Sequence, residues 1–207
     1  MDTRLKARLS FFIYITVLAV SDTRFSYMIL NMFLAFAALE ISFLLPLFKV
    51  NSKREIFVST FFYGVFILLA PNVFYVVTDL IHLNGYRFDY LNGLVIAEWC
   101  DFFILTSGVL LAIYYFILML EQIESLPQEI RWKDVCIGAF IILSSIGVFI
   151  GRFLRFHSIH LFTDPISVMK LFTNSLNEGA LLFICGISLL QFIIYWLFRD
   201  LKRVEGV

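Results

Sequence analysis

Four polar side chains recur at helical spacing in the apolar segment PNVFYVVTDLIHL, which covers residues 71–83. Asn72, Tyr75, Asp79 and His82 follow one another at intervals of three, four and three residues, so they share one face of a helix. A carboxylate one turn from an imidazole can orient that imidazole as a general base, whereas the amide and the phenol can hydrogen bond to a ligand. The stripe therefore predicts one wall of a polar site.

Charged residues also gather at the ends of two later apolar segments. EWCDFF contains Glu98 and Asp101 three residues apart, and GRFLRFHSIHLFTDP contains Arg152 and Arg155 at the same spacing. A pair of arginines can bind a phosphate or a carboxylate bidentately. An ion pair between one of these arginines and Asp79 or Asp101 would instead lock the helices together. Both alternatives place these residues at one shared polar site.

Three more polar residues are candidates on their own. Asn31 could join the site through a hydrogen bond between helices, and Ser158 could serve as a nucleophile, although no Gly-x-Ser-x-Gly context supports it. Glu40 lies deeper in its apolar segment, where an unpaired ionised carboxylate costs about 3 kcal/mol. We expect Glu40 to be protonated, partnered or placed in a hydrated crevice. The cysteines are isolated from one another, which predicts packing roles, and no metal or cofactor is expected.

The composition indicates a membrane protein. Of the 207 residues, 61% are hydrophobic and 15% are charged, whereas soluble domains are about half apolar and about a quarter charged. Sixteen basic and sixteen acidic residues cancel, so nothing in the charge balance argues for nucleic acid as a partner. Membrane lipids are the expected surroundings and the expected partner.

Apolar segments long enough to cross a membrane follow one another along the chain. A spanning helix needs about 20 apolar residues, and the segments that qualify are 26–48, 56–83, 94–120, 135–155 and 178–198. A shorter one, Leu9–Val20, follows Arg4, Lys6 and Arg8 and is either a retained first helix, which we favour, or a cleaved signal peptide. We predict an all-α polytopic transmembrane helix bundle of six spans, or five if the first is cleaved, forming a single domain over residues 1–207.

The distribution of Lys and Arg predicts the orientation of the bundle. With the N-terminus inside, the cytoplasmic segments hold eleven basic residues and the outer segments hold five. Both termini are therefore predicted to be cytoplasmic, and the polar ends of segments 56–83, 94–120 and 135–155 are predicted to face outward. The connection 156–177 is expected to contain a short helix along the membrane surface.

Three motifs carry a resemblance to a known family. LNMFLAF at 30–36, PNVFYVVTDLIHL at 71–83 and GRFLRFHSIHLFTDP at 151–165 resemble the bacterial membrane proteins of the domain-of-unknown-function 1361 family. The family pattern has a Trp-Asn-Leu-Phe-Leu-Ala start, a Pro-Asn-x-x-Tyr-x-x-Thr-Asp-Leu-x-His core and a Gly-Arg-Phe-Leu-Arg segment ending in Asn-Ser-Trp-Asp. The positions that fit it are Asn31, Pro71, Asn72, Tyr75, Thr78, Asp79, His82, Arg152, Arg155, Ser158 and Pro165.

The departures from the family pattern bear on metal binding. Leu30 replaces the Trp, and His157 and His160 replace the Asn and the Asp around Ser158. Because the family pattern lacks these two histidines, a metal site built on them with His82 is not expected. The resemblance implies a bacterial cell membrane as the location, and it supplies no activity.

Three classes of function fit the predicted site. The first is the binding or transport of an anionic or lipid-headgroup ligand at an extracytoplasmic polar site. The second is an accessory or structural membrane subunit that contacts a partner membrane protein and is held together by a helix-locking ion-pair network. The third is a membrane-embedded acid–base enzyme acting on a lipid-linked substrate, with Asp79 and His82 as catalytic residues. The candidate site comprises Asn31, Asn72, Tyr75, Thr78, Asp79, His82, Asp101, Arg152, Arg155 and Ser158.

Overall fold

The computed structural model describes residues 2–49, 53–86, 88, 93–126, 130–155 and 163–205, and this part of the chain is helical without a strand. Its α-helices are α1 (Thr3–Val20), α2 (Met28–Ser42), α3 (Ile56–Leu69), α4 (Pro71–Thr78), α5 (Ile96–Ser125), α6 (Ile130–Phe153), α8 (Pro165–Ser175) and α9 (Glu178–Glu205). Three 3₁₀-helices are η1 (Leu45–Phe48), η2 (Lys53–Glu55) and η3 (Asp79–Gly85). The predicted all-α class is confirmed for these residues.

Among the described residues, four helical segments are long and apolar enough to cross a membrane. They are Ile56–Gly85, which joins α3, α4 and η3, then Ile96–Ser125, Trp132–Phe153 and Glu178–Arg199. Helix α2 is apolar but has only 15 residues, and α1 carries three basic residues in its first two turns. The chain therefore has the helices of a multi-pass membrane protein.

Proline marks the places where the α-helix is interrupted in two predicted segments. Segment 26–48 leaves the α-helix at Ser42 and continues as the 3₁₀-turn η1, which contains Pro46. Segment 56–83 passes from α3 to α4 at Ala70, directly before Pro71. Proline lacks the N–H that an α-helix interior needs, so the hydrogen-bond ladder is interrupted at Pro71 although Ala70 before it keeps helical backbone.

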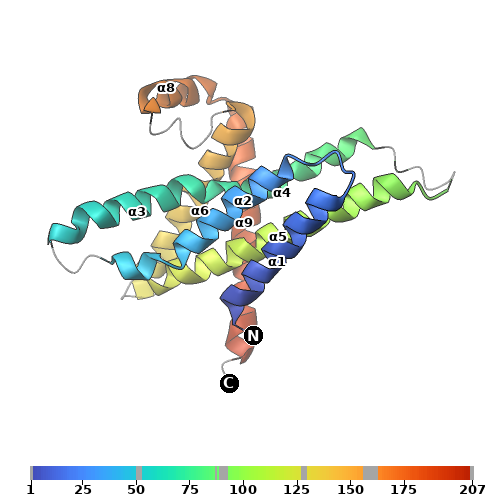
Figure 1. Ribbon diagram of the computed structural model, residues 1–207. Helices are drawn as coiled ribbons and strands as arrows, with labels where there is room; N and C mark the ends of the chain where they lie inside the picture. The colour runs from blue at the N-terminus through green and yellow to red at the C-terminus, as the bar shows by residue number, and fades with distance from the viewer. Residues whose placement is uncertain are drawn as a thin grey trace.

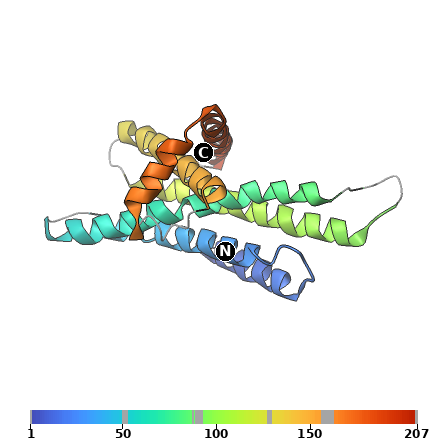
Figure 2. The same cartoon turned by 90° about the horizontal axis from the view of Figure 1, so that it is seen from above.

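The helices do not all run in one direction. Figure 1 shows α3 and α4 crossing the view one after the other, α5 running beside α4, and α9 standing upright behind them. Seen from above in Figure 2, α4 lies between α2 and α6, and it contacts both of them. The two ends of the chain lie at the same end of the molecule in Figure 1.

The core lies where α2, α4, α5 and α6 meet. On α4, Val73, Phe74 and Val76 are buried, and the Phe74 ring lies 5.3 Å from the ring of Phe116. Phe116 in turn stacks on Phe140 at 6.1 Å. Lipid tails are as apolar as these side chains, so close packing and polar contacts between helices hold a membrane bundle together.

Helix α1 is packed into this bundle. The residues that it buries are Ala7, Phe11, Tyr14 and Leu18. The Tyr115 hydroxyl donates to the Ala7 carbonyl at 3.1 Å, and the Tyr14 hydroxyl donates to the Ile104 carbonyl at 3.2 Å. Both bonds connect α1 with α5, so α1 has specific contacts beyond its apolar surface.

The predicted short helix in the connection 156–177 is present as α8. Its N-cap is Asp164, whose side chain accepts a hydrogen bond from the backbone N–H of Ser167 at 3.2 Å. Hydrogen bonds from Ser167 lower the pKa of Asp164. A carboxylate at this position satisfies a donor that the first helical turn leaves open.

Candidate functional site

The polar stripe begins on α4 and continues on η3. Asp79 is the residue at which the α-helix tightens into the 3₁₀-helix Asp79–Gly85. Residues three apart eclipse one another in a 3₁₀-helix, which brings His82 over Asp79. The His82 Nε2 atom lies 3.8 Å from Asp79 Oδ1.

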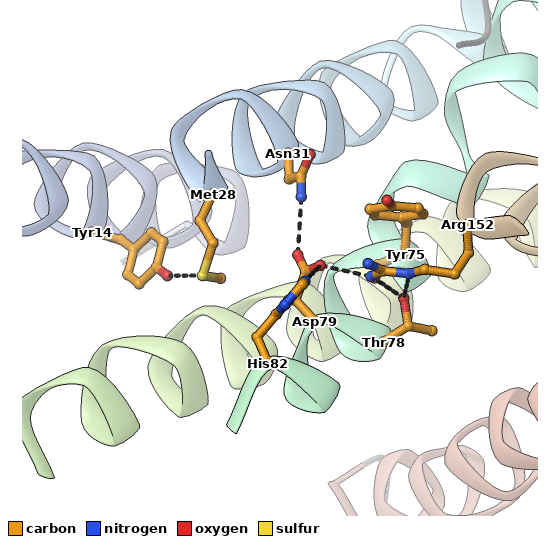
Figure 3. Close-up of polar contacts among 8 residues, drawn as sticks. All are labelled: Tyr14, Met28, Asn31, Tyr75, Thr78, Asp79, His82 and Arg152. Carbon is orange, nitrogen blue, oxygen red and sulfur yellow. Dashed lines mark hydrogen bonds and ion pairs between the residues drawn. The ribbon is translucent and has the colours of Figure 1, made fainter. Parts of the chain in front are cut away.

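Asp79 is the centre of the site. Its side chain is almost fully buried, with a relative exposure of 1%. The Oδ1 atom accepts a hydrogen bond from Arg152 Nη2 at 2.6 Å, and Oδ2 accepts one from Asn31 Nδ2 at 3.0 Å. Figure 3 shows these partners approaching the carboxylate from different helices. A buried carboxylate is stable only when it is paired and hydrogen bonded, so Asp79 ties α2 and α6 to the start of η3.

Arg152 is held along one edge of its guanidinium. The Nε atom donates to Thr78 Oγ1 at 3.0 Å, and Nη2 donates to the same hydroxyl, to Asp79 and to the Tyr75 carbonyl. The guanidinium carbon also lies 4.1 Å from the centre of the Tyr75 ring, as Figure 3 shows. Within the described residues the Nη1 atom donates no hydrogen bond, and 17% of the Arg152 side chain is exposed.

Two glycines on α6 let Arg152 reach this position. A Cβ atom added to Gly147 would lie 2.3 Å from Cγ of Pro71, and one added to Gly151 would lie 3.4 Å from the Tyr75 ring. The two glycines are four residues apart, which is the spacing of the Gly-x-x-x-Gly motif that lets membrane helices approach closely. Their contact with α4 sets the height at which Arg152 meets Asp79.

His82 forms the rim of the site. Its side chain is 43% exposed, and its ring meets the Tyr27 ring edge-to-face at 5.2 Å. The 3.8 Å separation of His82 Nε2 and Asp79 Oδ1 exceeds hydrogen-bond length. The structure therefore places the two candidate catalytic residues side by side without the bond that orients a general base.

Two other predicted residues, Asn72 and Arg155, are placed differently, and a third cannot be placed. Asn72 donates to the Leu69 carbonyl of its own helical turn at 2.9 Å. Arg155 is exposed and has a positive φ of 56° just after the end of α6. Ser158 lies outside the described residues, as do His157 and His160.

Asp101 belongs to a second polar cluster at the start of α5. It is buried and accepts hydrogen bonds from Thr23 Oγ1 at 2.6 Å and from the Tyr86 hydroxyl. Arg24 lies 5.7 Å above the Tyr86 ring. Burial raises the pKa of Tyr86 to about 12, and the hydrogen bond to Asp101 acts in the same direction. This cluster fastens the α1–α2 turn and the end of η3 to α5.

Some residues of the site carry no signal in the stripe or the charge pattern. Gly147 and Gly151 could have been found from their four-residue spacing next to Arg152. Tyr27 lies at the start of α2, and its proximity to His82 follows from the tertiary fold alone. No group of three or more His, Cys, Asp or Glu side chains that could hold a metal ion occurs among the described residues.

Helices of spanning length around a buried Asp–Arg pair define this chain as a multi-pass membrane protein with a polar site between its helices. Residues 30–194 match the model of the family described as "Protein of unknown function (DUF1361)", and the chain belongs to this family. The resemblance seen in the sequence motifs is thereby confirmed. The comparisons with curated proteins and with solved structures find no match.

Proposed function

We propose that this protein binds an anionic group, the phosphate or carboxylate of a lipid headgroup or of a small molecule, at Arg152. One observation carries the proposal. Arg152 is fixed along one edge by Thr78 and Asp79, while its Nη1 atom donates to none of the described residues. A guanidinium has five N–H donors in a rigid fork, so an anion can bind at Nη1 while the ion pair of Nη2 with Asp79 stays closed.

The surroundings of Arg152 favour an anion. Arg152 and Asp79 cancel in charge, and Arg155, three residues further along the chain, adds a positive charge that is exposed. A guanidinium already stacked on the Tyr75 ring at 4.1 Å loses little conformational freedom when a ligand binds. His82, which is 43% exposed, can donate a further hydrogen bond from the rim.

A six-span topology in a bacterial cell membrane, with both termini cytoplasmic, completes the proposal. It is supported by the contacts of α1 with α5, which favour a retained first helix, and by the two chain ends lying at the same end of the molecule. Helix α5 has 30 residues and is about 45 Å long at about 1.5 Å per residue, whereas the hydrocarbon layer is about 30 Å thick. Because α5 is longer than the hydrocarbon layer is thick, it can cross the membrane at a tilt. Helix α9, which runs across the direction of α5 in Figure 1, can then cross the membrane at a different angle.

Binding is tested with defined probes on the purified full chain in neutral detergent. Short-chain phosphatidylglycerol, inorganic phosphate and acetate are titrated against the wild-type protein, Arg155→Gln and Arg152→Lys, with Lys170→Gln as the matched control on α8. A charge-assisted hydrogen bond contributes about 1.5–3 kcal/mol, and every 1.4 kcal/mol is about tenfold in affinity. We expect both arginine variants to bind at least about tenfold more weakly and Lys170→Gln to bind like the wild type.

The outcomes of these titrations separate the possible ligands. Binding of phosphatidylglycerol alone assigns a lipid headgroup, and binding of phosphate or acetate assigns a small anion. If no probe binds, or if both arginine variants bind as tightly as the wild type, Arg152 is not a ligand-binding residue and the proposal fails.

A structural role is the second candidate, and a different observation favours it. Both oxygens of Asp79 are hydrogen bonded, and its side chain is only 1% exposed. A closed network of this kind can hold helices together without binding anything. In that case the charged side chains would matter for stability, partner contacts would lie elsewhere, and none of the anions would bind at Arg152. No contact among the described residues adds support to the acid–base enzyme.

A further inference from the structure

A second ion cluster lies toward the other end of α2. Glu40 accepts hydrogen bonds from Arg4 Nη2 at 2.7 Å and from Arg8 Nε and Nη2 at 2.7 and 2.8 Å. Glu40 and Asn31 are nine residues apart on α2, about 14 Å at about 1.5 Å per residue. The cluster joins α1 to α2. Of the three states expected for Glu40, which were protonated, partnered or placed in a hydrated crevice, the structure shows the partnered one.

The two arginines offer more hydrogen-bond donors than Glu40 can use. Two guanidinium groups carry ten N–H donors, and only three hydrogen bonds to Glu40 occupy them within the described part of the chain. The Nε atom of Arg4 is buried and has no hydrogen-bond partner. A buried donor without an acceptor is costly, so this side of the cluster is suited to a further acceptor.

The charge of the cluster is positive. Arg4 and Arg8 share one carboxylate, which leaves a formal charge of one. The negative charge of Asp2 attracts the Arg8 guanidinium. Lys6 is exposed and lies between the two arginines in sequence. Because Asp2 and Lys6 cancel, the net charge stays positive when they are included.

The apolar surroundings indicate that the acceptor comes with a lipid. On the same helix, Leu5 and Leu9 are 47% and 44% exposed, and Phe12 further along is 61% exposed. Exposed apolar side chains next to unfilled guanidinium donors match a molecule that has both acyl chains and a phosphate. The Arg4 guanidinium also lies 5.1 Å from the centre of the Phe43 ring, which limits its conformational freedom.

We propose that Arg4 and Arg8, oriented by Glu40, bind the phosphate of an anionic phospholipid headgroup. The site lies where the start of α1 meets the end of α2. This site is separate from the Arg152 site, because it uses other residues and lies toward the other end of α2. Clusters of Lys and Arg at the membrane surface attract anionic lipids in general. The Glu40 cluster differs from such a patch in having its guanidinium groups fixed before the lipid arrives.

Native mass spectrometry of the full chain, delipidated and titrated with phosphatidylglycerol and with phosphatidylcholine, tests the site. We expect phosphatidylglycerol to bind preferentially, and Arg4→Gln to lower its affinity about tenfold. Arg54→Gln is the matched control, since Arg54 is an exposed arginine on η2 and the substitution removes the same charge. Equal losses for Arg4→Gln and Arg54→Gln would show general electrostatic attraction and overturn the proposal.

Glu40→Gln separates a lipid site from a structural lock. Removing the carboxylate frees the two guanidinium groups that it orients, so we expect the preference for phosphatidylglycerol over phosphatidylcholine to fall although the formal charge of the pair rises. A lock between α1 and α2 would instead lose thermal stability with no change in this lipid preference. Complete displacement of phosphatidylglycerol by inorganic phosphate at equal concentration would assign a soluble anion and contradict the lipid.

Discussion

Substituting Gly147 tests how the site is assembled, because its contact with Pro71 brings α6 close to α4. An alanine Cβ at position 147 would lie 2.3 Å and 2.7 Å from Cγ and Cβ of Pro71. Carbon atoms that are not bonded prefer about 3.5–4.0 Å, and the proline ring cannot rotate away. The two helices must therefore separate by more than about 1 Å. Arg152 lies five residues further along α6, and its Nη2 atom is 2.6 Å from Asp79 Oδ1, so this separation would break the ion pair.

The expected loss of stability for Gly147→Ala follows from these two effects. Overpacking costs about 1–3 kcal/mol, and it is offset by up to about 1 kcal/mol because alanine favours a helix over glycine. Leaving Asp79 buried without its partner adds up to about 3–5 kcal/mol. With the ion pair broken, these terms add to a loss of about 3–8 kcal/mol. At about 2–4 °C per kcal/mol for a chain of this size, the melting temperature falls by roughly 6 °C or more.

Two other glycines on α6 are the controls for this measurement. A Cβ at Gly138 would meet nothing within 4 Å, and one at Gly151 would make an ordinary contact with Tyr75 at 3.4 Å. Thermal unfolding in mild detergent should show Gly138→Ala equal to or above the wild type, Gly151→Ala close to it, and Gly147→Ala clearly below. Equal melting temperatures for Gly147→Ala and Gly138→Ala would refute the close approach of α4 and α6.

Three further predictions concern the polar clusters. Asp79→Asn and Arg152→Gln should each lower the free energy of unfolding by about 3–5 kcal/mol. The double variant should lose at least about 1 kcal/mol less than the sum of the two single losses. Additive losses would mean that the pair does not interact. Thr78→Val, which removes the hydroxyl that accepts from Arg152, should cost about 1–3 kcal/mol in the same unfolding assay, and an unchanged melting temperature would contradict this bond. The raised pKa of Tyr86 means that its neutral phenol contributes stability that is complete below pH of about 10 and is lost as the pH rises through about 12. Phenolate absorbance should show that Tyr86→Phe lacks a tyrosine titrating near pH 12, and the loss of an ordinary one near pH of about 10 would contradict the hydrogen bond to Asp101.

Local periodicity and charge predicted much of the site. The stripe of Tyr75, Asp79 and His82 was visible because these residues lie within one helical segment. The alternative of an ion pair between Asp79 and one arginine was open from charge alone, and the structure shows that this arginine is Arg152. Which arginine pairs with Asp79 depends on how far α6 is shifted along α4. The contacts of Gly147 and Gly151 with α4 set this shift.

Other features could not be predicted from local patterns. Asp101 binds Thr23 and Tyr86, residues that lie 78 and 15 positions away along the chain, and their hydroxyl groups carry no charge that a count would detect. The helix changes to 3₁₀ geometry at Asp79, which alters the position of His82 relative to Asp79. A spacing of three residues fits both an α-helix and a 3₁₀-helix, so the sequence does not distinguish them. Helix-helix packing, which decides both features, depends on the shape of many side chains together.

The Asp79 junction also constrains the order in which the protein is built. Synthesis proceeds from the N-terminus, and Arg152 follows Asp79 by 73 residues, whereas Asn31 precedes it by 48. The carboxylate is therefore synthesised before its arginine exists. Asn31 is already present and can hydrogen bond to Asp79. The ion pair closes only when α6 arrives with Arg152, so its completion shows that the two halves of the chain have met.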